Sequence, residues 1–438
     1  MIKVKRLPPG LYSLLEKASI PFFGLASFFI VVRAFEQSEF GVWTLFISVS
    51  ALLESVHNAF ILTPFVKYYH TVSKAERKHI VAGSLILNSC IALSIALLIL
   101  LLSGRIATIF DASSLAGILE MHILHLPLIV GVIQLNAFFH ANGAFNNSFK
   151  LSFVRRCTFF LYVLYSLLPG RDITMDSLVV AQIISSILSL ILFSKILIGL
   201  LRTVYSGWRE WITTLFNYGK YTVSTNLTSV LFKNTDTWML GVLLSPVSVA
   251  LYNPAIRISG LIEVPTGALA SYIYPKLSKL STENQVKNFS ATLERTIAVN
   301  LAVYLPVILV LSFTASFVID MLVGSNYAES ASVLQITLLH ALFIPIERHL
   351  GIAFNALGKP TFNFYLAVLR TIINVAMNYL LISAYGIDGA AIATLVSYSS
   401  GAFISLLLIQ QFNSVRILNI LKYILFFFLN PVTALKQI

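Results

Sequence analysis

Ionisable and polar side chains recur inside the long apolar runs of this sequence, and several of them are spaced three or four residues apart, which places them on one face of a helix, although Arg257 and Glu263 lie about 120° apart. The sets are Ser50, Glu54, His57 and Asn58; His122, His125, Asn136 and His140; Ser229, Lys233 and Asp236; Asn253, Arg257 and Glu263; His340, Glu347, Arg348 and Asn355; and Arg370, Asn374 and Asn378. Such groups are costly in hydrocarbon, so these faces predict a hydrated cavity or structural pairs.

The cationic members of these sets predict an anionic substrate, because guanidinium groups grip phosphate through paired hydrogen bonds. We expect substrate contacts in the cavity from Arg257, Lys233, Arg348, Arg370, Lys220 and Asn253. The alternative is structural: Lys233 could pair with Asp236, and Glu347 with Arg348. Lys220 could also reach the membrane interface along its aliphatic stem.

Three carboxylates, Glu54, Glu263 and Asp236, are candidates for coupling to protons or sodium, since intramembrane acids often lie on ion pathways. His122 and His125 are spaced for metal binding, but no cysteine or carboxylate near them in the sequence completes a ligand set. Packing or hydrogen bonding is therefore favoured for the two histidines, and we expect no metal and no cofactor.

The composition places these helices in a membrane. Hydrophobic residues make up 57% of the 438 residues and charged residues 11%, against roughly 25% charged residues in soluble domains. The net charge of +12 is distributed over short loops and not along one soluble face, which argues against a nucleic-acid partner.

Apolar runs long enough to cross about 30 Å of hydrocarbon predict an all-α polytopic protein with about twelve spans. They lie near 11–33, 41–63, 80–103, 118–140, 149–168, 177–199, 214–235, 249–274, 293–318, 332–354, 363–385 and 390–411. Basic residues gather at the two termini and in alternate loops, which predicts that both termini are cytoplasmic.

The two halves of the chain repeat each other. Rare residues coincide when the sequence is shifted by 209 or 215 positions: Glu54 with Glu263, Lys67 with Lys276, His125 with His340, Phe139 with Phe354, Gly143 with Gly358, and Arg155 with Arg370. This parallel repeat predicts bundles of about six helices at 1–205 and 206–412, with a cavity between them. The remaining residues, 413–438, predict a cytoplasmic or interfacial tail.

The motifs of soluble catalytic and motor domains are missing from the sequence. It contains no phosphate-binding P-loop, no His-Glu-x-x-His zinc motif and no nucleophile elbow. The predicted outer loops are also short, so a membrane-bound polysaccharide polymerase is the less favoured alternative, and we expect a protein that is not an enzyme.

Two stretches resemble the polysaccharide flippases, the Wzx-type O-antigen and repeat-unit transporters. The first is Arg33-Ala34-Phe35 followed by Glu39-Phe40-Gly41-Val42-Trp43. The second runs from Leu251-Tyr252-Asn253-Pro254-Ala255-Ile256-Arg257 to Tyr274-Pro275-Lys276-Leu277-Ser278-Lys279-Leu280. Weaker matches occur at 324–328 and 355–360, so the resemblance extends over nearly the whole chain.

The resemblance implies a V-shaped fold like that of multidrug and toxin extrusion transporters. It also implies a cargo, an undecaprenyl-pyrophosphate-linked oligosaccharide, moved across the bacterial inner membrane during O-antigen or other polysaccharide synthesis. A polymerase and glycosyltransferases would be partners. Because Arg257 lies within the best-matching motif, it is the first residue for which the resemblance implies a role in binding substrate. Rivals of the same fold are an ion-coupled multidrug exporter, which would need an acidic cavity, and a lipid II flippase, which usually has two extra spans.

Overall fold

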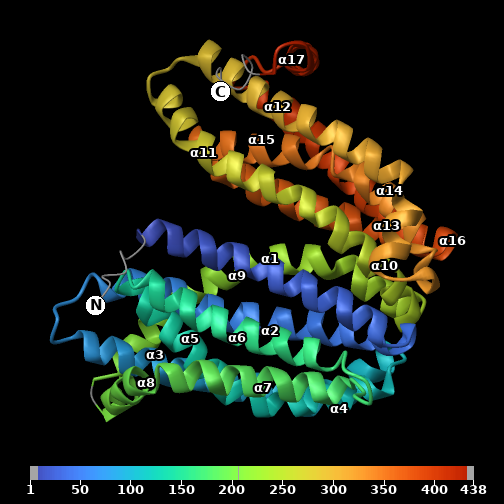
Figure 1. Ribbon diagram of the computed structural model, residues 1–438. Coiled ribbons are helices and arrows are strands. Elements are labelled where there is room, and N and C mark those ends of the chain that lie inside the picture. Colours follow the sequence, from blue (N-terminus) through green and yellow to red (C-terminus); the bar gives the residue numbers. More distant parts are fainter. Residues whose placement is uncertain (1–7, 206, 432–438) are drawn as a thin grey trace, which may run out of the picture. The chain divides into compact units, whose positions relative to one another are not determined.

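A computed structural model describes residues 8–205 and 207–431, and within these ranges the chain is helical with no strand (Figure 1). The basic residues expected to orient the termini, Lys3, Lys5, Arg6 and Lys436, lie outside the described residues. The chain divides into two compact units, Met1–Leu231 and Phe232–Ile438. The boundary lies inside the helix α9, Arg209–Leu243.

The first unit contains the helices before α9 and the beginning of α9. They are α1 (Pro9–Ala34), α2 (Gln37–Tyr69), α3 (Arg77–Ile109), α4 (Ser113–His122), η1 (Ile123–His125), α5 (Leu126–Ala141), α6 (Phe145–Tyr165), α7 (Met175–Leu192), α8 (Ser194–Leu201) and η2 (Arg202–Tyr205). Within this unit α1 packs on α6, α6 on α7, and α2 on α5.

The second unit contains the remainder of α9 and the helices that follow. They are α10 (Pro246–Ser259), η3 (Gly260–Ile262), α11 (Glu263–Thr282), α12 (Val286–Phe313), α13 (Ala315–Leu322), η4 (Ser325–Tyr327), α14 (Ser330–His340), α15 (Ile344–Ala356), α16 (Pro360–Ile409) and α17 (Ile417–Leu429). Here α15 and α14 pack on α16, α11 on α15, and α12 on α17.

Every predicted span lies mostly on helix, and eight helical stretches of the described chain are long and apolar enough to cross a membrane. The prediction of a polytopic all-α membrane protein is confirmed. The predicted spans 149–168, 214–235 and 249–274 are helices outside these eight. They carry charged residues such as Arg155, Lys233 and Arg257, which lower their hydropathy.

Two predicted spans form the single helix α16, which bends at Gly386. This residue has φ 59° and ψ −134°, a conformation open to glycine because it has no Cβ. The bend separates the predicted spans 363–385 and 390–411. Beside it, a cavity of about 350 Å³ is lined in part by two acidic residues, Glu329 and Asp388.

The internal repeat is visible in the backbone of two turns. Gly143 and Gly358 both have positive φ, 64° and 70°, directly after α5 and α15. In each turn the amide after the glycine donates to the carbonyl of a buried phenylalanine, Phe139 or Phe354, at 2.8 Å. This is a Schellman helix end, which explains why glycine recurs at both positions.

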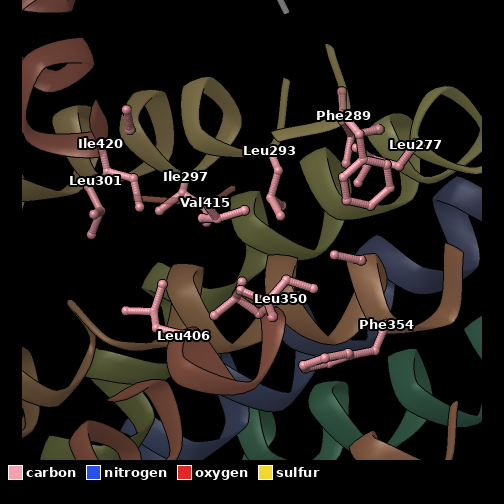
Figure 2. Close-up of a cluster of buried hydrophobic side chains, with 14 of the residues drawn as sticks. Leu277, Phe289, Leu293, Ile297, Leu301, Leu350, Phe354, Leu406, Val415 and Ile420 are labelled. Atoms are coloured by element: carbon pink, nitrogen blue, oxygen red, sulfur yellow. The ribbon is translucent and has the colours of Figure 1, made fainter. Parts of the chain in front are cut away.

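The apolar core of the second unit joins five helices. Figure 2 shows side chains of this core, among them Leu293 of α12, Leu350 of α15, Leu406 of α16 and Ile420 of α17. Since Ile420 is 2% exposed, the part of the predicted tail that forms α17, Ile417–Leu429, is packed into this core. Its other face is also apolar, with Leu425 largely exposed, and its predicted position at the membrane interface stays a prediction.

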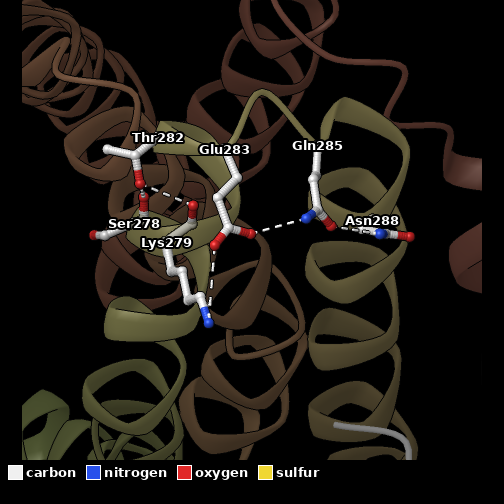
Figure 3. A network of polar contacts seen from close by, with 6 residues as sticks. All are labelled: Ser278, Lys279, Thr282, Glu283, Gln285 and Asn288. Carbon is white, nitrogen blue, oxygen red and sulfur yellow. Dashed lines mark hydrogen bonds and ion pairs between the residues drawn. The ribbon is translucent and has the colours of Figure 1, made fainter.

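The turn between α11 and α12 is held by polar contacts (Figure 3). Lys279 pairs with Glu283 at 3.8 Å, and Glu283 accepts a hydrogen bond from Gln285 at 2.8 Å. Asn288 in turn donates to Gln285 at 2.7 Å. Exposed pairs of this kind contribute little stability, about 0–1 kcal/mol.

Candidate functional site

Asp236 lies at the centre of a buried polar cluster in the second unit. Its carboxylate accepts hydrogen bonds from four neutral side chains, and we call these five residues the Asp236 cluster. The donors are Tyr252 of α10 at 2.6 Å and, from α16, Asn374 at 3.1 Å, Asn378 at 2.8 Å and Thr394 at 2.5 Å. Two of the polar faces read from the sequence, those of α9 and α16, therefore meet here.

The Asp236 cluster is rich in oxygen atoms that could hold a cation. Asp236 is 8% exposed, and the side-chain carbonyl oxygens of Asn374 and Asn378 are buried without a hydrogen-bond partner. The partners of the Asp236 carboxylate are these neutral groups, and the alternative pairing with Lys233 is not formed. A carboxylate with amide and hydroxyl oxygens is a donor set for a hard cation or a proton.

Arg370 and Glu347 form a second buried group in the same unit. The Arg370 guanidinium pairs with the Glu347 carboxylate and lies over the rings of Phe232 at 4.1 Å and Tyr398 at 4.9 Å. The His340 ring stacks on the ring of Tyr398, with the two ring centroids 5.0 Å apart. The alternative pairing of Glu347 with Arg348 was wrong, because adjacent helical residues point in different directions.

The other predicted substrate residues of the second unit divide by exposure. Lys233, Arg257 and Arg348 are exposed on α9, α10 and α15. Asn253 is instead 6% exposed and donates to the Val249 carbonyl one turn earlier, at 3.1 Å. The structure thus places three cations on the surface of this unit and directs the Asn253 amide to the backbone.

The predicted carboxylate Glu263 is partly buried at the first position of α11. It lies close enough to Tyr304 and Tyr398 to interact with them electrostatically. The Tyr304 hydroxyl contacts Thr266 and the Ile262 carbonyl, and so braces the 3-10 turn before α11. Glu263 is not among the residues that make up the Asp236 cluster.

Lys220 and Glu54 belong to the first unit. Lys220 is exposed on α9, with its ammonium group 3.5 Å from the Asn217 side chain. Glu54, on α2, lies beside His122 and His125: one ligand atom from each residue falls within 4.8 Å of the others. The sequence indicated no cysteine or carboxylate cluster around these histidines, and the structure brings a single carboxylate to them, that of Glu54, from a helix remote in the sequence.

A further acidic residue, Glu16, did not stand out in the sequence. Its carboxylate accepts hydrogen bonds from Ser148 at 3.0 Å and Ser152 at 2.8 Å, both on α6. Ser148 also contacts Asn136 at 2.6 Å and His140 at 3.3 Å. The signal that could have revealed it was a lone glutamate inside the first apolar run.

Comparison with protein families identifies one match, to the family described as polysaccharide biosynthesis protein, over residues 30–332. Among individual proteins, the probable low-salt glycan biosynthesis flippase Agl15 of Haloferax volcanii is 24% identical over 46% of this chain and 43% of its own length. The putative O-antigen transporter of Shigella flexneri is 23% identical over 45% of this chain and 46% of its own. These matches span less than half the length of those relatives.

Solved structures show the same fold. The lipid II flippase MurJ in an inward closed conformation superimposes with a TM-score of 0.76 at 19% identity, covering 95% of this chain and 90% of MurJ. An inward-facing multidrug resistance MATE family transporter of the MOP superfamily has a TM-score of 0.75 at 15% identity, covering 90% and 96%. The family match extends over more than half of the sequence, and the chain therefore belongs to the polysaccharide biosynthesis protein family.

Proposed function

We propose that this protein is a flippase for a lipid-linked oligosaccharide. The cargo is an undecaprenyl-pyrophosphate-linked repeat unit, and alternating access moves it from the cytoplasmic to the outer leaflet of a bacterial inner membrane. The observation that carries this proposal is the family match over residues 30–332. The names of two partial relatives, a glycan biosynthesis flippase and an O-antigen transporter, support it.

The pyrophosphate of such a cargo suits the exposed cations of the second unit. Arg257, Arg348 and Lys233 are exposed side chains on helices placed within predicted spans. Contact with lipid tails would be costly for them, so they favour a hydrated space or headgroups. Arginine can hold a phosphate with two parallel hydrogen bonds. We assign these three residues, with Lys220, to cargo binding. Asn253 and Arg370 are assigned to supporting the structure of the cargo-binding site.

The Asp236 cluster supports a role in ion coupling. Its carboxylate is buried among neutral donors, so a proton or sodium ion arriving there would neutralise it without competition from a paired lysine or arginine. Glu54 and Glu263 are the other candidates for coupling. We further propose that the bundles 1–205 and 206–412 move against each other and that both termini are cytoplasmic. A polysaccharide polymerase and glycosyltransferases are the proposed partners.

Lipid II flippase activity is the second candidate, because MurJ shares the fold over most of both chains. Multidrug export is the third, because a multidrug transporter shares the fold almost as closely. In none of these activities is the cargo chemically changed, so the protein is proposed not to be an enzyme.

The test is a proteoliposome assay with fluorescent lipid-linked cargo, in which the outer-leaflet fraction is measured after addition of a membrane-impermeant quencher. We expect movement of undecaprenyl-pyrophosphate oligosaccharide, faster in a sodium or proton gradient and slower in Asp236→Asn. Arg257→Ala and Arg257→Glu should reduce the rate about tenfold, as loss of about 1.4 kcal/mol of binding would, with Arg257→Lys intermediate. Arg105→Ala, an exposed arginine of the first unit, is the control.

Movement of lipid II alone, or of cationic drugs alone, would replace the proposal with the corresponding alternative. Equal rates for Arg257→Ala, Arg257→Glu and Arg257→Lys would remove Arg257 from the cargo site. In cells, depletion should leave lipid-linked repeat units on the cytoplasmic leaflet, and a normal leaflet distribution would refute the flippase function.

A further inference from the structure

The first unit contains a pair of buried histidines without hydrogen-bond partners for most of their ring nitrogens. His122 is 0% exposed and neither of its ring nitrogens has a partner. His125 is 4% exposed, and its Nδ1 also has no partner. Buried polar atoms are nearly always satisfied, so three open imidazole nitrogens in one place call for something to bind them.

The local backbone brings these two rings together. His122 ends α4 and His125 ends the short 3-10 turn η1, after which α5 begins with Pro127 in its first turn. The two imidazoles consequently lie edge to face, with centroids 5.3 Å apart. Glu54 approaches them from α2, and one ligand atom from each residue lies within 4.8 Å of the others.

We propose that Glu54, His122 and His125 form a binding site for a transition-metal ion of the zinc class. Two imidazole nitrogens and one carboxylate oxygen match the donors of open zinc sites, in which a fourth position is left to water or a ligand. Calcium and magnesium would instead require oxygen donors throughout. Ligand atoms of a tetrahedral zinc ion lie roughly 3.3 Å apart, given bonds of about 2.0–2.1 Å. The three ligand atoms, which lie within 4.8 Å of one another, would have to approach by up to about 1.5 Å to reach that spacing.

Surrounding contacts hold the ligands in the required orientation. His125 Nε2 lies 2.7 Å from the Ser186 hydroxyl of α7, which fixes the ring and leaves Nδ1 directed away from that contact. Partners of this kind set the tautomer of metal-binding histidines and raise their affinity. Phe46 of α2 packs edge-on against His122 at 5.6 Å. His57 of α2 is held by a separate contact: its Nε2 lies 2.5 Å from the Asn88 side chain, while its Nδ1 has no hydrogen-bond partner.

The charges around the site are compatible with a bound divalent cation. Glu54 supplies one negative charge, while two arginines of α6 interact electrostatically with the ligands, Arg155 with His125 and Arg156 with Glu54. The ion would therefore keep part of its positive charge, which favours an anionic or hydroxide ligand in the open position. This proposal concerns the first unit alone and does not depend on the cargo of the protein.

The test uses full-length protein purified without a polyhistidine tag, stripped with chelator and titrated with Co²⁺ or Zn²⁺. We expect about one tightly held ion per chain, the visible absorption bands of four-coordinate Co²⁺, and a melting temperature that rises with metal concentration. These wild-type measurements need no variant. Absence of stoichiometric Co²⁺ and of the thermal shift would overturn the proposal.

Variants then locate the site. His122→Gln and Glu54→Gln should abolish the Co²⁺ spectrum, and Ser186→Ala should weaken binding roughly 10–100-fold, as loss of an orienting partner does. His349→Gln is the matched control, because this histidine is also 0% exposed but contacts the Pro345 carbonyl in the second unit. Metal binding that is unchanged in His122→Gln and Glu54→Gln would show that the ion binds elsewhere and would overturn the proposal.

Discussion

Replacing Arg370 with methionine separates a structural role for this residue from a role in cargo binding. The side chains of Arg370 and Glu347 are 24% and 13% exposed, so most of the ion pair is buried. Methionine has a similar length and can stay between the Phe232 and Tyr398 rings, which the guanidinium now covers at 4.1 and 4.9 Å. The change therefore removes the charge while most of the packing is kept.

The expected loss of stability follows from the charge of Glu347, which remains without its partner. Removing one partner of a buried ion pair leaves an uncompensated charge and costs about 3–5 kcal/mol. The lost cation–π contacts add about 1 kcal/mol, and partial exposure of both groups reduces the total. We expect Arg370→Met to lower the free energy of unfolding by about 3 kcal/mol. The double variant Glu347→Gln with Arg370→Met should recover to within about 1 kcal/mol of the original, since no charge is then left unpaired.

The measurement is denaturant unfolding in detergent micelles, followed by tryptophan fluorescence, for the original protein, both single variants and the double variant. Transport is measured on the same preparations. If the losses of the single variants simply add in the double variant, the two residues are not coupled and the structural argument fails. If stability is unchanged but transport falls, Arg370 contacts cargo directly and the role assigned here is wrong.

Three further predictions concern close packing at two glycines and the docking of α17. At Gly401, a methyl group would overlap the Glu347 carboxylate oxygen, so Gly401→Ala should destabilise by about 1–3 kcal/mol. In Gly104→Ala, where no atom lies within 4 Å of the new methyl group, a gain of about 0.5–1 kcal/mol is expected in the same unfolding assay. Glu294 is 2% exposed and accepts hydrogen bonds from the Arg416 amide at 2.7 Å and the Asn419 side chain at 3.1 Å. Glu294→Ala should therefore release the start of α17 at a cost of about 2–3 kcal/mol, seen as faster hydrogen exchange over 416–424; unchanged exchange would contradict this docking.

Much of the local structure was predictable because it depends on properties that run along the chain. Hydropathy located the helices, and the charged residues in three of them explain why these are less apolar than the rest. Gly143 and Gly358, matched by the repeat, end their helices with the same positive-φ turn. The sequence likewise placed Arg370, Asn374 and Asn378 on one face of a helix, and the structure shows all three making polar contacts.

The partners of these residues were not predictable. Sequence spacing suggested Lys233 as the partner of Asp236 and Arg348 as the partner of Glu347. It suggested no acidic partner for His122. The contacts observed in the structure come from other helices. Asp236 instead accepts hydrogen bonds from Tyr252 of α10 and from three residues of α16, and Glu54 of α2 lies beside the histidines. Glu16 was missed for the same reason, since its serine partners follow it by more than a hundred residues.

The sequence by itself thus determined which segments are helical, which of them suit a membrane, and which polar residues share a face. These follow from hydrophobicity and from the 3.6-residue period of the helix. Only the tertiary structure decided which faces meet, because the rotation and offset of packed helices result from the fit of whole surfaces. That fit joins Asp236 to α16, Arg370 to Glu347, and Glu54 to the two histidines.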